Sequence, residues 1–517
     1  MPEFDASKMM HADSGRARAA STAMSSASAA GARELSPLAR MIAAEPVPRA
    51  VSGVVLGGLV RLYEFIAILG LGLAIFHGYV HPHEPFSWRY FFAIAGISTA
   101  TVAIFHLADL YSITLLRTRI EQLSRVGVIW ITMMLCAAAI TFFVRPVGEY
   151  SRVWAAAWFG SALLFLYFGR LLLSALVRHW TREGRLVRRT VIVGGGTAGE
   201  TLIHALEAQR DSDLILRGVF DDRSDERSPP SVAGQSKLGT VDDLVEFARR
   251  TRIDLLLVSL PITAEERVLQ MVRKLWVLPV DIRLAAHTSK LRFRPRAYSY
   301  IGNVPVLDIF DKPIADWNMV VKSAFDRIVG TMILLAALPV MFLTAIAVKL
   351  DSPGPIFFRQ RRYGFNNELI EIWKFRSLHH AQSDASASTL VGAGDTRVTR
   401  VGRFIRKTSL DELPQLLNVV IFGNLSLVGP RPHALNAKAE TRLYEEAVDG
   451  YFARHRVKPG ITGWAQVNGW RGNTDTQEKI QQRIEHDLYY IENWSLLFDI
   501  YIVLRTPFAL IKAENAH

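Results

Sequence analysis

The sequence predicts a membrane protein of mixed class, with four transmembrane helices, a Rossmann-like α/β domain, and a mainly α-helical C-terminal domain that carries a re-entrant membrane helix. Three observations lead to this prediction. Long apolar runs fill residues 51–180, a glycine-rich turn follows a short strand near residue 194, and a further apolar run near residue 328 contains Pro339. Because the chain has 517 residues, several domains are expected rather than one.

The composition agrees with a membrane location. Half of the residues are apolar and 21% are charged, and the apolar residues are concentrated in long runs. The net charge of +12 fits positively charged cytoplasmic loops, and it also fits attraction to anionic headgroups and phosphorylated substrates. We therefore expect a lipid bilayer as a partner, and no nucleic acid. The single cysteine, Cys136, excludes an intrachain disulfide and a thiolate metal cluster.

The first 50 residues are rich in alanine, serine and methionine without a strong period, so we expect a disordered cytoplasmic tail at 1–50. Each of the four apolar runs that follow supplies the ~20 residues needed to cross ~30 Å of hydrocarbon. The runs are 54–80, 90–107, 126–144 and 153–177. Arginines are enriched in the tail, between the second and third runs, and after the fourth run, which predicts that both ends of this region are cytoplasmic.

Residues 187–315 have the pattern of a doubly wound α/β domain. A short apolar strand ends in a turn with Gly194, Gly196 and Gly199, and a second strand ends at Asp221. These residues predict NAD(P) or a nucleotide sugar at the helix N-terminus. The alternative is a domain that keeps the turn and binds nothing, or binds a regulatory ligand. None of the fourteen tyrosines has a lysine four residues later, which argues against redox chemistry of the dehydrogenase or dehydratase type.

The fifth apolar run, 328–348, has no charged residue and is long enough to span a membrane. A span would place the rest of the chain outside the cell, away from cytoplasmic nucleotide-activated substrates. Pro339 lies in the middle of the run, where proline costs about 3 kcal/mol in a straight helix. We therefore predict a re-entrant helix at 325–350 that breaks at Pro339 and returns. A kinked spanning helix is the alternative.

Asp411 and Glu412 lie among clustered arginines, in the most informative stretch of the chain. Carboxylates beside fixed cations indicate chemistry on phosphates: the cations bind the phosphates, while one carboxylate attacks and the other binds a metal or moves a proton. Ser409 and Glu412 also fit a helix capping box, which is the structural alternative for this pair.

Five linked motifs lie in this region: Lys374-Phe-Arg-Ser377, Gly394-Asp-Thr-Arg397, Arg406 to Gln415, Gly429-Pro-Arg-Pro432 and Lys458-Pro-Gly-Ile-Thr-Gly-Trp-Ala-Gln-Val-Asn468. With these motifs the chain resembles the bacterial sugar transferase family, the monotopic polyprenyl-phosphate hexose-1-phosphate transferases, over about residues 322–506. The upstream regions resemble the long members, which start exopolysaccharide, capsule or O-antigen repeat units. The resemblance implies a catalytic domain at 320–517 on the cytoplasmic side of the bacterial inner membrane.

The family's reaction comes with this resemblance. A UDP-hexose gives its sugar-1-phosphate to undecaprenyl phosphate, and UMP is released. Asp411 matches the nucleophile that forms a covalent phospho-sugar intermediate, and Glu412 matches the glutamate tied to Mg²⁺. The positions that match substrate-binding residues are Arg406, Arg431, Asp487, Lys374 and Arg376. The chain departs from the family at Leu338, where a serine often precedes the proline, and at Gly423-Asn-Leu425 in place of Gly-Asp-Met.

Several choices stay open at this point. Glucose-1-phosphate is the expected group, because Gly472-Asn-Thr-Asp-Thr476 and Asn493-Trp-Ser495 resemble members that transfer it, and UDP-galactose is the second choice of donor. A membrane-anchored nucleotide-sugar dehydratase or epimerase and a non-enzymatic scaffold are the other classes considered. The apolar stretch 494–504 fits an interfacial helix or ordinary packing. The transmembrane region and the middle domain offer surfaces for a homodimer.

Overall fold

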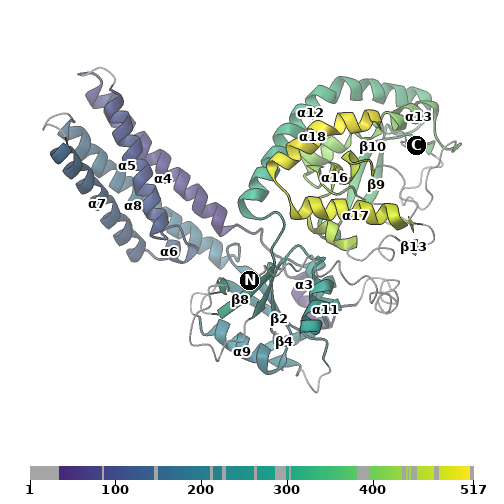
Figure 1. The fold of residues 1–517 in the computed structure, drawn as a ribbon, viewed down its shortest axis with the longest axis horizontal. Helices are drawn as coiled ribbons and strands as arrows, with labels where there is room; N and C mark the ends of the chain where they lie inside the picture. Colours follow the sequence, from purple (N-terminus) through teal and green to yellow (C-terminus); the bar gives the residue numbers. More distant parts are fainter. Residues whose placement is uncertain are drawn as a thin grey trace. The chain divides into compact units, whose positions relative to one another are not determined.

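The computed structural model describes residues 34–83, 87–144, 150–209, 213–223, 229–260, 265–285, 299–301, 304–380, 395–432, 438–439, 442–443, 451–470 and 477–512. The chain divides into two compact units. One is Pro46–Arg188, and the other combines Met1–Glu45 with Arg189–His517. Figure 1 shows long helices in the first unit, and in the second unit a sheet flanked by helices and a domain along which the long helix α12 curves.

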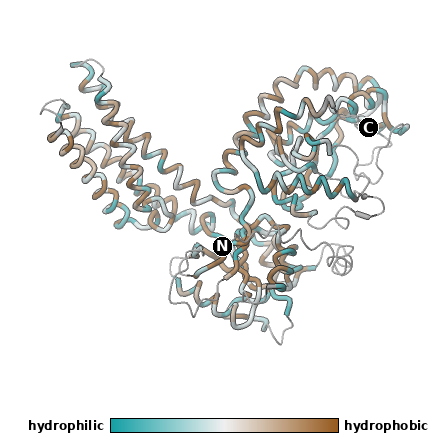
Figure 2. The backbone as a smooth tube through the Cα atoms, viewed as in Figure 1, coloured by the Kyte–Doolittle hydropathy of each residue, from teal (hydrophilic) through white to brown (hydrophobic). Residues whose placement is uncertain are grey.

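The first unit is built from long apolar helices. They are α4 (Gly53–Ile75), which continues as the π-helix η1 (Phe76–Val80), α5 (Trp88–Leu107), the short α6 (Ile113–Arg117), α7 (Ile120–Val144) and α8 (Arg152–Arg182). The four long helices cover the four predicted apolar runs, and each is long and apolar enough to cross a membrane. Apolar residues occur along their whole length (Figure 2).

Two charges that interrupt these apolar runs are buried together. Arg170 on α8 donates from Nε and Nη2 to the two carboxylate oxygens of Glu64 on α4, at 2.6 and 3.0 Å. Arg170 Nη1 also donates to the Leu110 carbonyl at 2.7 Å, and the Tyr111 hydroxyl donates to Glu64 at 2.9 Å. The pair therefore joins α4, α8 and the segment before α6, and each charge has a partner where an unpaired one would be costly.

The middle domain contains an eight-stranded sheet with the order β3-β4-β2-β1-β5-β6-β8-β7. Its elements are β1 (Arg188–Val193), α9 (Gly196–Glu207), β2 (Leu214–Phe220), β3 (Ser231–Val232), β4 (Gln235–Gly239), α10 (Val241–Arg250), β5 (Leu255–Val258), α11 (Glu265–Leu275), β6 (Asp281–Ala285), β7 (Ser299–Ile301) and β8 (Val304–Phe310). Strands β1, β5 and β6 are parallel, which confirms the predicted α/β domain. The antiparallel strands β7 and β8 extend one edge and were not predicted.

The prediction of a disordered tail at 1–50 is wrong for its last part. Residues 1–33 lie outside the described residues, but Pro37–Ala44 forms helix α3. Leu35 and Ala39 are buried in the core of the middle domain. The reason is tertiary, because a short alanine-rich segment becomes ordered when an apolar surface is available to cover it.

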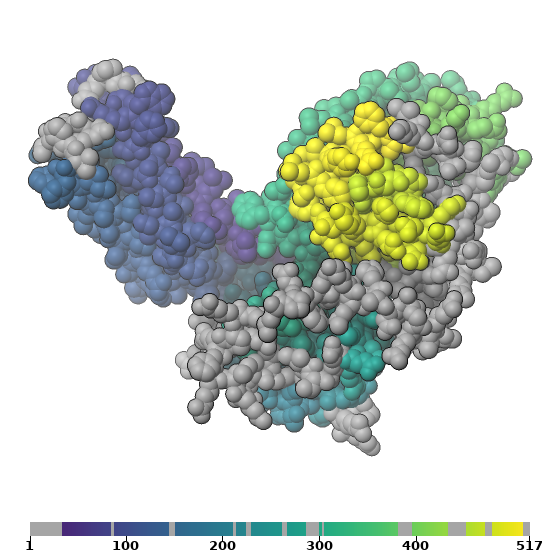
Figure 3. Space-filling view, in the orientation of Figure 1, coloured from purple at the N-terminus to yellow at the C-terminus, as the bar shows by residue number. Residues whose placement is uncertain are grey.

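The C-terminal domain begins with α12 (Asp316–Asp351), which is followed by a hairpin of β9 (Phe357–Tyr363) and β10 (Leu369–Phe375). Then come α13 (Arg400–Lys407), η4 (Leu410–Glu412), α14 (Gln415–Leu417), η5 (Asn418–Phe422), β11 (Ser426–Val428), β12 (Lys438–Ala439), β13 (Arg442–Leu443), η6 (Tyr451–Arg456), β14 (Gly460–Thr462), α16 (Trp464–Val467), α17 (Gln477–Glu492) and α18 (Leu496–Lys512). Strand β11 pairs in parallel with β14. In Figure 3, α17 and α18 (yellow) form much of the visible surface of this domain.

The predicted break at Pro339 is not found. Helix α12 is continuous over its 36 residues with Pro339 inside it, and Figure 1 shows it as a curve. A proline removes one helix hydrogen bond, and bending allows the helix to continue on both sides of it. The fifth apolar run therefore forms a bent helix rather than two helices separated by a break.

Both halves of α12 pack against the same domain. Asp326 and Gly330 are buried in the first half, while Met341 and Val348 of the second half cluster with Phe375. Its other side exposes large apolar side chains, among them Ile328, Met332, Leu335, Leu338, Phe342 and Leu343. Helix α18 also exposes apolar residues, namely Leu497, Tyr501, Leu504 and Phe508. The domain therefore carries an outward apolar surface formed by two helices.

Candidate active site

Asp411 and Glu412 lie in a single turn after α13. Thr399 caps the start of α13 through its side-chain oxygen. After the end of the helix, Ser409 adopts a left-handed conformation (φ 59°), and the turn η4 then presents the two carboxylates. The Ser409 hydroxyl makes no capping hydrogen bond, so the capping-box explanation of the pair is wrong. Ser409 therefore ends α13 and places the acidic dyad, Asp411 and Glu412, on a turn.

Glu412 is held by two cations from distant parts of the sequence. Its Oε1 accepts from Lys374 Nζ at 2.9 Å and from Arg431 Nη2 at 2.5 Å, while Oε2 lies 3.4 Å from Arg431 Nη1. Lys374 comes from β10, and Arg431 follows β11. The structure therefore brings together three of the residues that the motifs predicted for the site.

The electrostatics of Asp411 differ from those of an exposed aspartate. Burial is the largest influence and raises the pKa of Asp411, and the negative charge of Glu412 raises it further. Lys374, Arg406 and Arg431 act in the opposite direction. The same acidic pair raises the pKa of Arg431, chiefly through Glu412. The site therefore combines two adjacent carboxylates with three cations, as an anionic substrate requires.

Arg376 does not join this cluster, although it is two residues from Lys374. Its guanidinium is buried and donates to the carbonyls of Ser352 (2.6 Å), Pro353 (2.9 Å) and Val348 (3.3 Å). These carbonyls belong to the C-terminal end of α12 and the residues after it. Arg376 therefore caps α12, and its role in the structure is to attach that helix end to β10.

Asp487 lies behind Arg431 rather than beside the carboxylates. It is buried on α17 and accepts from Arg454 Nη2 at 2.7 Å. The same nitrogen of Arg454 donates to the main-chain carbonyl of Arg431 at 2.6 Å. Burial raises the pKa of Asp487, and the charge of Arg454 acts against this shift. The predicted substrate contact is therefore separated from the dyad by a buried arginine.

Two residues of this arrangement were not predicted. Arg454 was missed because an arginine in Arg454-His-Arg456 is not distinguished in sequence from a solvated basic cluster. Asn418 is fully buried; its Oδ1 accepts the Trp373 N–H at 3.0 Å and its Nδ2 donates to the Glu371 carbonyl at 2.7 Å. It thus holds the strand that carries Lys374. Asn418 lies three residues after the motif Arg406 to Gln415, and this position was its only signal in the sequence.

The polar main-chain groups of the glycine-rich turn after β1 are bonded to two side chains of the same domain, Asp221 and Arg223. Asp221 Oδ2 accepts the Gly195 N–H at 2.7 Å, and Arg223 Nη2 donates to the Gly195 carbonyl at 2.6 Å. Arg223 Nε also donates to the Asp221 carboxylate at 3.0 Å. Gly194 has φ 98°, and a Cβ at Gly199 would lie 2.7 Å from the Gly194 oxygen, so both glycines are required by the backbone. Asp221, which was predicted to belong to a nucleotide-binding site, accepts hydrogen bonds from Gly195 and Arg223 instead.

A metal site can be assessed from the donor set. Among the described residues, no group of three or more histidine, cysteine, aspartate or glutamate side chains could enclose an ion. Mg²⁺ commonly takes one or two carboxylates and completes its coordination with substrate phosphates and water. Asp411 and Glu412 fit such an open site. A metal on Glu412 would share the carboxylate with Lys374 and Arg431.

Known protein families and known proteins match most of this chain. The family described as bacterial sugar transferase matches residues 317–513, and one described as CoA-binding domain matches residues 106–286.

The chain is 37% identical to the UDP-glucose:undecaprenyl-phosphate glucose-1-phosphate transferase of Escherichia coli (strain K12), over 73% of this chain and 79% of that protein. It is 32% identical to the protein of the same name from Xanthomonas campestris pv. campestris, over 89% of this chain and 94% of that protein. The undecaprenyl-phosphate glucose phosphotransferase of Komagataeibacter xylinus is 36% identical, over 72% of this chain and 68% of that protein. A chain so similar along most of its length to these proteins, with Lys374 and Arg431 of its motifs at Glu412, belongs to the bacterial sugar transferase family.

Proposed function

We propose that this protein transfers glucose-1-phosphate from UDP-glucose to undecaprenyl phosphate, releases UMP, and so starts the repeat unit of an exopolysaccharide, capsule or O-antigen. The observation that carries the proposal is the contact of Lys374 and Arg431 with Glu412, next to Asp411. The names of the similar proteins from E. coli and X. campestris support the donor and the acceptor. UDP-galactose is the competing donor.

Asp411 is the proposed nucleophile. One of its carboxylate oxygens attacks the phosphorus that carries the sugar, the bond from this phosphorus to UMP breaks, and UMP leaves. A phosphate oxygen of undecaprenyl phosphate then attacks the same phosphorus, which releases Asp411 and leaves a sugar diphosphate lipid. Lys374, Arg406 and Arg431 offset the negative charge of both substrates, which is the main requirement of phosphoryl transfer.

Glu412 is the residue proposed to hold Mg²⁺, with Asp411 beside it. The ion would supply further positive charge to the phosphates of the donor. Independently of the ion, Glu412 orients Lys374 and Arg431, because both cations converge on its Oε1. The glutamate therefore has a role in holding the cations even before substrate binds.

The membrane arrangement proposed for this protein is a multi-pass inner-membrane protein with a cytoplasmic catalytic domain. Helix α12 is proposed to enter the cytoplasmic leaflet and return. The support is that its first and second halves both pack on one domain, while the opposite side exposes apolar residues. A helix that crossed the bilayer would carry its two ends to opposite sides of it. Helix α18 would lie along the same membrane surface.

The reaction is tested with the purified full-length protein. It is incubated with UDP-glucose, Mg²⁺ and undecaprenyl phosphate, and UMP release and labelled lipid are measured beside Asp411→Asn. We expect at least about a 10³-fold loss in the variant, as for removal of other nucleophiles. Glu371→Gln is the matched control, because Glu371 is exposed on β10 and lies 3.7 Å from Arg359 rather than near the dyad. Equal activity of Asp411→Asn and wild type would refute the nucleophile, and no UMP release by wild type would refute the reaction.

The re-entrant arrangement is tested by labelling. In a Cys136→Ala background, single cysteines replace Asn318, near the start of α12, and Pro355, just after its end; both positions are exposed. Membrane vesicles of known orientation are treated with an impermeant maleimide. Both cysteines should react from the cytoplasmic side. Reaction of the two from opposite sides would mean that α12 spans.

A further inference from the structure

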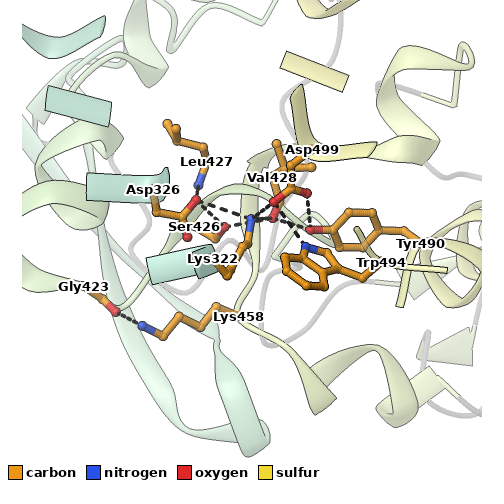
Figure 4. A network of polar contacts seen from close by, with 10 residues as sticks. All are labelled: Lys322, Asp326, Gly423, Ser426, Leu427, Val428, Lys458, Tyr490, Trp494 and Asp499. Carbon is orange, nitrogen blue, oxygen red and sulfur yellow. Dashed lines mark hydrogen bonds and ion pairs between the residues drawn. The ribbon is translucent and has the colours of Figure 1, made fainter. Parts of the chain in front are cut away.

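A buried ammonium group lies close to the segment that carries Arg431. Lys322 Nζ, from the first part of α12, donates to Asp499 Oδ2 at 2.6 Å, to the Val428 carbonyl at 3.0 Å and to Asp326 Oδ1 at 3.3 Å (Figure 4). An ammonium group has three donors, and each of them has an acceptor here. Asp499 comes from α18, and Val428 ends β11. One side chain therefore joins two apolar-faced helices to this strand.

Asp499 is held by further donors in the same network. The Tyr490 hydroxyl lies 2.8 Å from Asp499 Oδ1 and 3.0 Å from the Val428 carbonyl, so its single proton is shared between these two acceptors. Trp494 Nε1 donates to Asp499 Oδ2 at 3.2 Å. The side chain of Asp499 is fully buried and that of Lys322 nearly so. Figure 4 shows Lys322 and Tyr490 both directed at the Val428 carbonyl and at Asp499.

The segment from Val428 to Arg431 is held along its length, so the position of the Val428 carbonyl affects the position of Arg431. The Gly429 N–H donates to the Thr462 carbonyl at 2.9 Å, and the Gly460 N–H donates to the Pro430 carbonyl at 3.0 Å. With its polar groups engaged at successive residues and a proline at 430, the segment has little freedom to turn. A shift of Val428 is therefore passed to Arg431. The paired contact between the Arg431 guanidinium and the Glu412 carboxylate is sensitive to such a shift, because it needs a defined orientation of both groups.

Stability alone does not explain this pair. Replacing a buried ion pair by apolar residues of similar volume is often neutral or stabilising, because desolvation offsets the Coulomb attraction. An apolar residue at position 322 could not donate to the Asp499 carboxylate and the Val428 carbonyl at the same time. The contacts thus favour a role in orientation.

We propose that Lys322 and Asp499 are positioning residues for Arg431. Lys322 donates to the Val428 carbonyl, and Asp499 keeps Lys322 and Tyr490 in place to do so. Through Val428 they position the arginine that contacts Glu412 and the substrate phosphate. The substrate contact rests on the proposed function. The pair joins the two helices with exposed apolar faces, α12 and α18, to the phosphate-binding cluster. The position of Arg431 therefore depends, through Lys322, on how α12 and α18 pack together.

The test compares Lys322→Met and Asp499→Asn with wild type in the full-length protein. UMP release is measured with varied UDP-glucose. We expect kcat to fall by about 10-fold or more while KM changes by less than about 3-fold, since orientation matters most in the transition state. Thr506→Val is the matched control. It removes a hydroxyl contact of 2.8 Å between α18 and Thr462 outside the Lys322 network, and it should keep wild-type kcat.

A double-mutant cycle separates positioning from general destabilisation. If Lys322 acts through Arg431, then Lys322→Met should cost little further activity in an Arg431→Lys background. Independent, multiplying losses would overturn the proposal, as would a Lys322→Met variant with wild-type kcat. Lys322→Arg should recover part of the activity, because it keeps a cation with several donors.

A second readout does not depend on catalysis. The rate at which phenylglyoxal modifies Arg431, followed by peptide mass spectrometry, should rise several-fold in Lys322→Met and stay at the wild-type value in Thr506→Val. An unchanged rate in Lys322→Met would overturn the proposal even if the wild type released no UMP. Absence of UMP release by the wild type would instead count against the proposed function alone.

Discussion

Arg454 connects Asp487 to Arg431. One nitrogen of its guanidinium lies 2.7 Å from the Asp487 carboxylate and 2.6 Å from the main-chain oxygen of Arg431, and the side chains of Arg454 and Asp487 are almost completely buried. The family resemblance placed Asp487 among the substrate-binding residues. The structure shows that its direct partner is a protein side chain. An effect of Asp487 on catalysis would therefore reach the site through the main chain of Arg431.

The first prediction concerns this pair. Asp487→Ala should destabilise the protein by about 3–5 kcal/mol, because it leaves the buried charge of Arg454 without its partner. Combining Arg454→Met with Asp487→Leu should recover much of that loss, since both charges are removed together. Activity should not recover with stability, because Arg431 still lacks the donor to its carbonyl. Thermal unfolding and UMP release of the single and the double variant check this, and parallel recovery of both properties would contradict it.

The second prediction contrasts Lys374 with Arg376. Lys374→Met should reduce UMP release strongly with little change in the unfolding midpoint, because Lys374 lies at Glu412 and is partly exposed. Arg376→Met should lower stability by about 2–4 kcal/mol, because carbonyls at the end of α12 lose their charged donor. Each variant is the control for the other. Equal effects of the two on stability would show that Arg376 does not anchor α12.

The third prediction is a pH dependence of stability. Burial, assisted by the charge of Arg454, lowers the pKa of His455 well below its usual value, so the folded protein holds the neutral ring. The unfolded chain binds a proton below about pH 6.5, so stability is lost as the pH falls through that value, with a slope of up to about 1.4 kcal/mol per pH unit. Among the described contacts, neither ring nitrogen has a hydrogen-bond partner.

His455→Phe should remove this dependence. The ring lies against Tyr363, Tyr451 and Phe452, so an aromatic replacement suits the site. Unfolding midpoints measured from pH 7 to pH 5 should fall less steeply in the variant than in wild type. Other titrating groups are common to both proteins and cancel in the difference. Parallel curves would show that His455 does not control this window.

The fourth prediction concerns the first unit. Either Glu64→Gln or Arg170→Met alone should destabilise the helical bundle by about 3–5 kcal/mol, because the remaining partner is left buried and uncompensated. The double variant should be closer to wild type. Thermal stability in detergent and yield of membrane-inserted protein are the measurements. A double variant as unstable as the worse single variant would mean that the pair is needed for more than mutual compensation.

Features that depend on local patterns could be predicted from the sequence. Long apolar runs indicate helices of membrane-spanning length, because hydrocarbon accepts only backbones whose hydrogen bonds are internally satisfied. The alternating strands and helices of the middle domain follow from short apolar segments separated by turns, and the structure confirms them. The sequence motifs also predicted that Asp411 and Glu412 lie beside cations, and the structure places Lys374 and Arg431 at Glu412. Even so, the sequence predicted a break at Pro339, and the bent continuous α12 had to be seen in the structure.

The assignment of each cation was decided by tertiary structure. Lys374 and Arg376 are two residues apart, but β10 ends at Phe375, so the two side chains go to different places: one to Glu412 and the other to the end of α12. Asp499, the carboxylate nearest to Lys322 Nζ, is 177 residues away in the sequence. Sequence determined which chemical groups this protein has and which helices and strands carry most of them. Packing alone decided which charges meet, because a buried charge must find a partner, and that partner can come from any part of the chain.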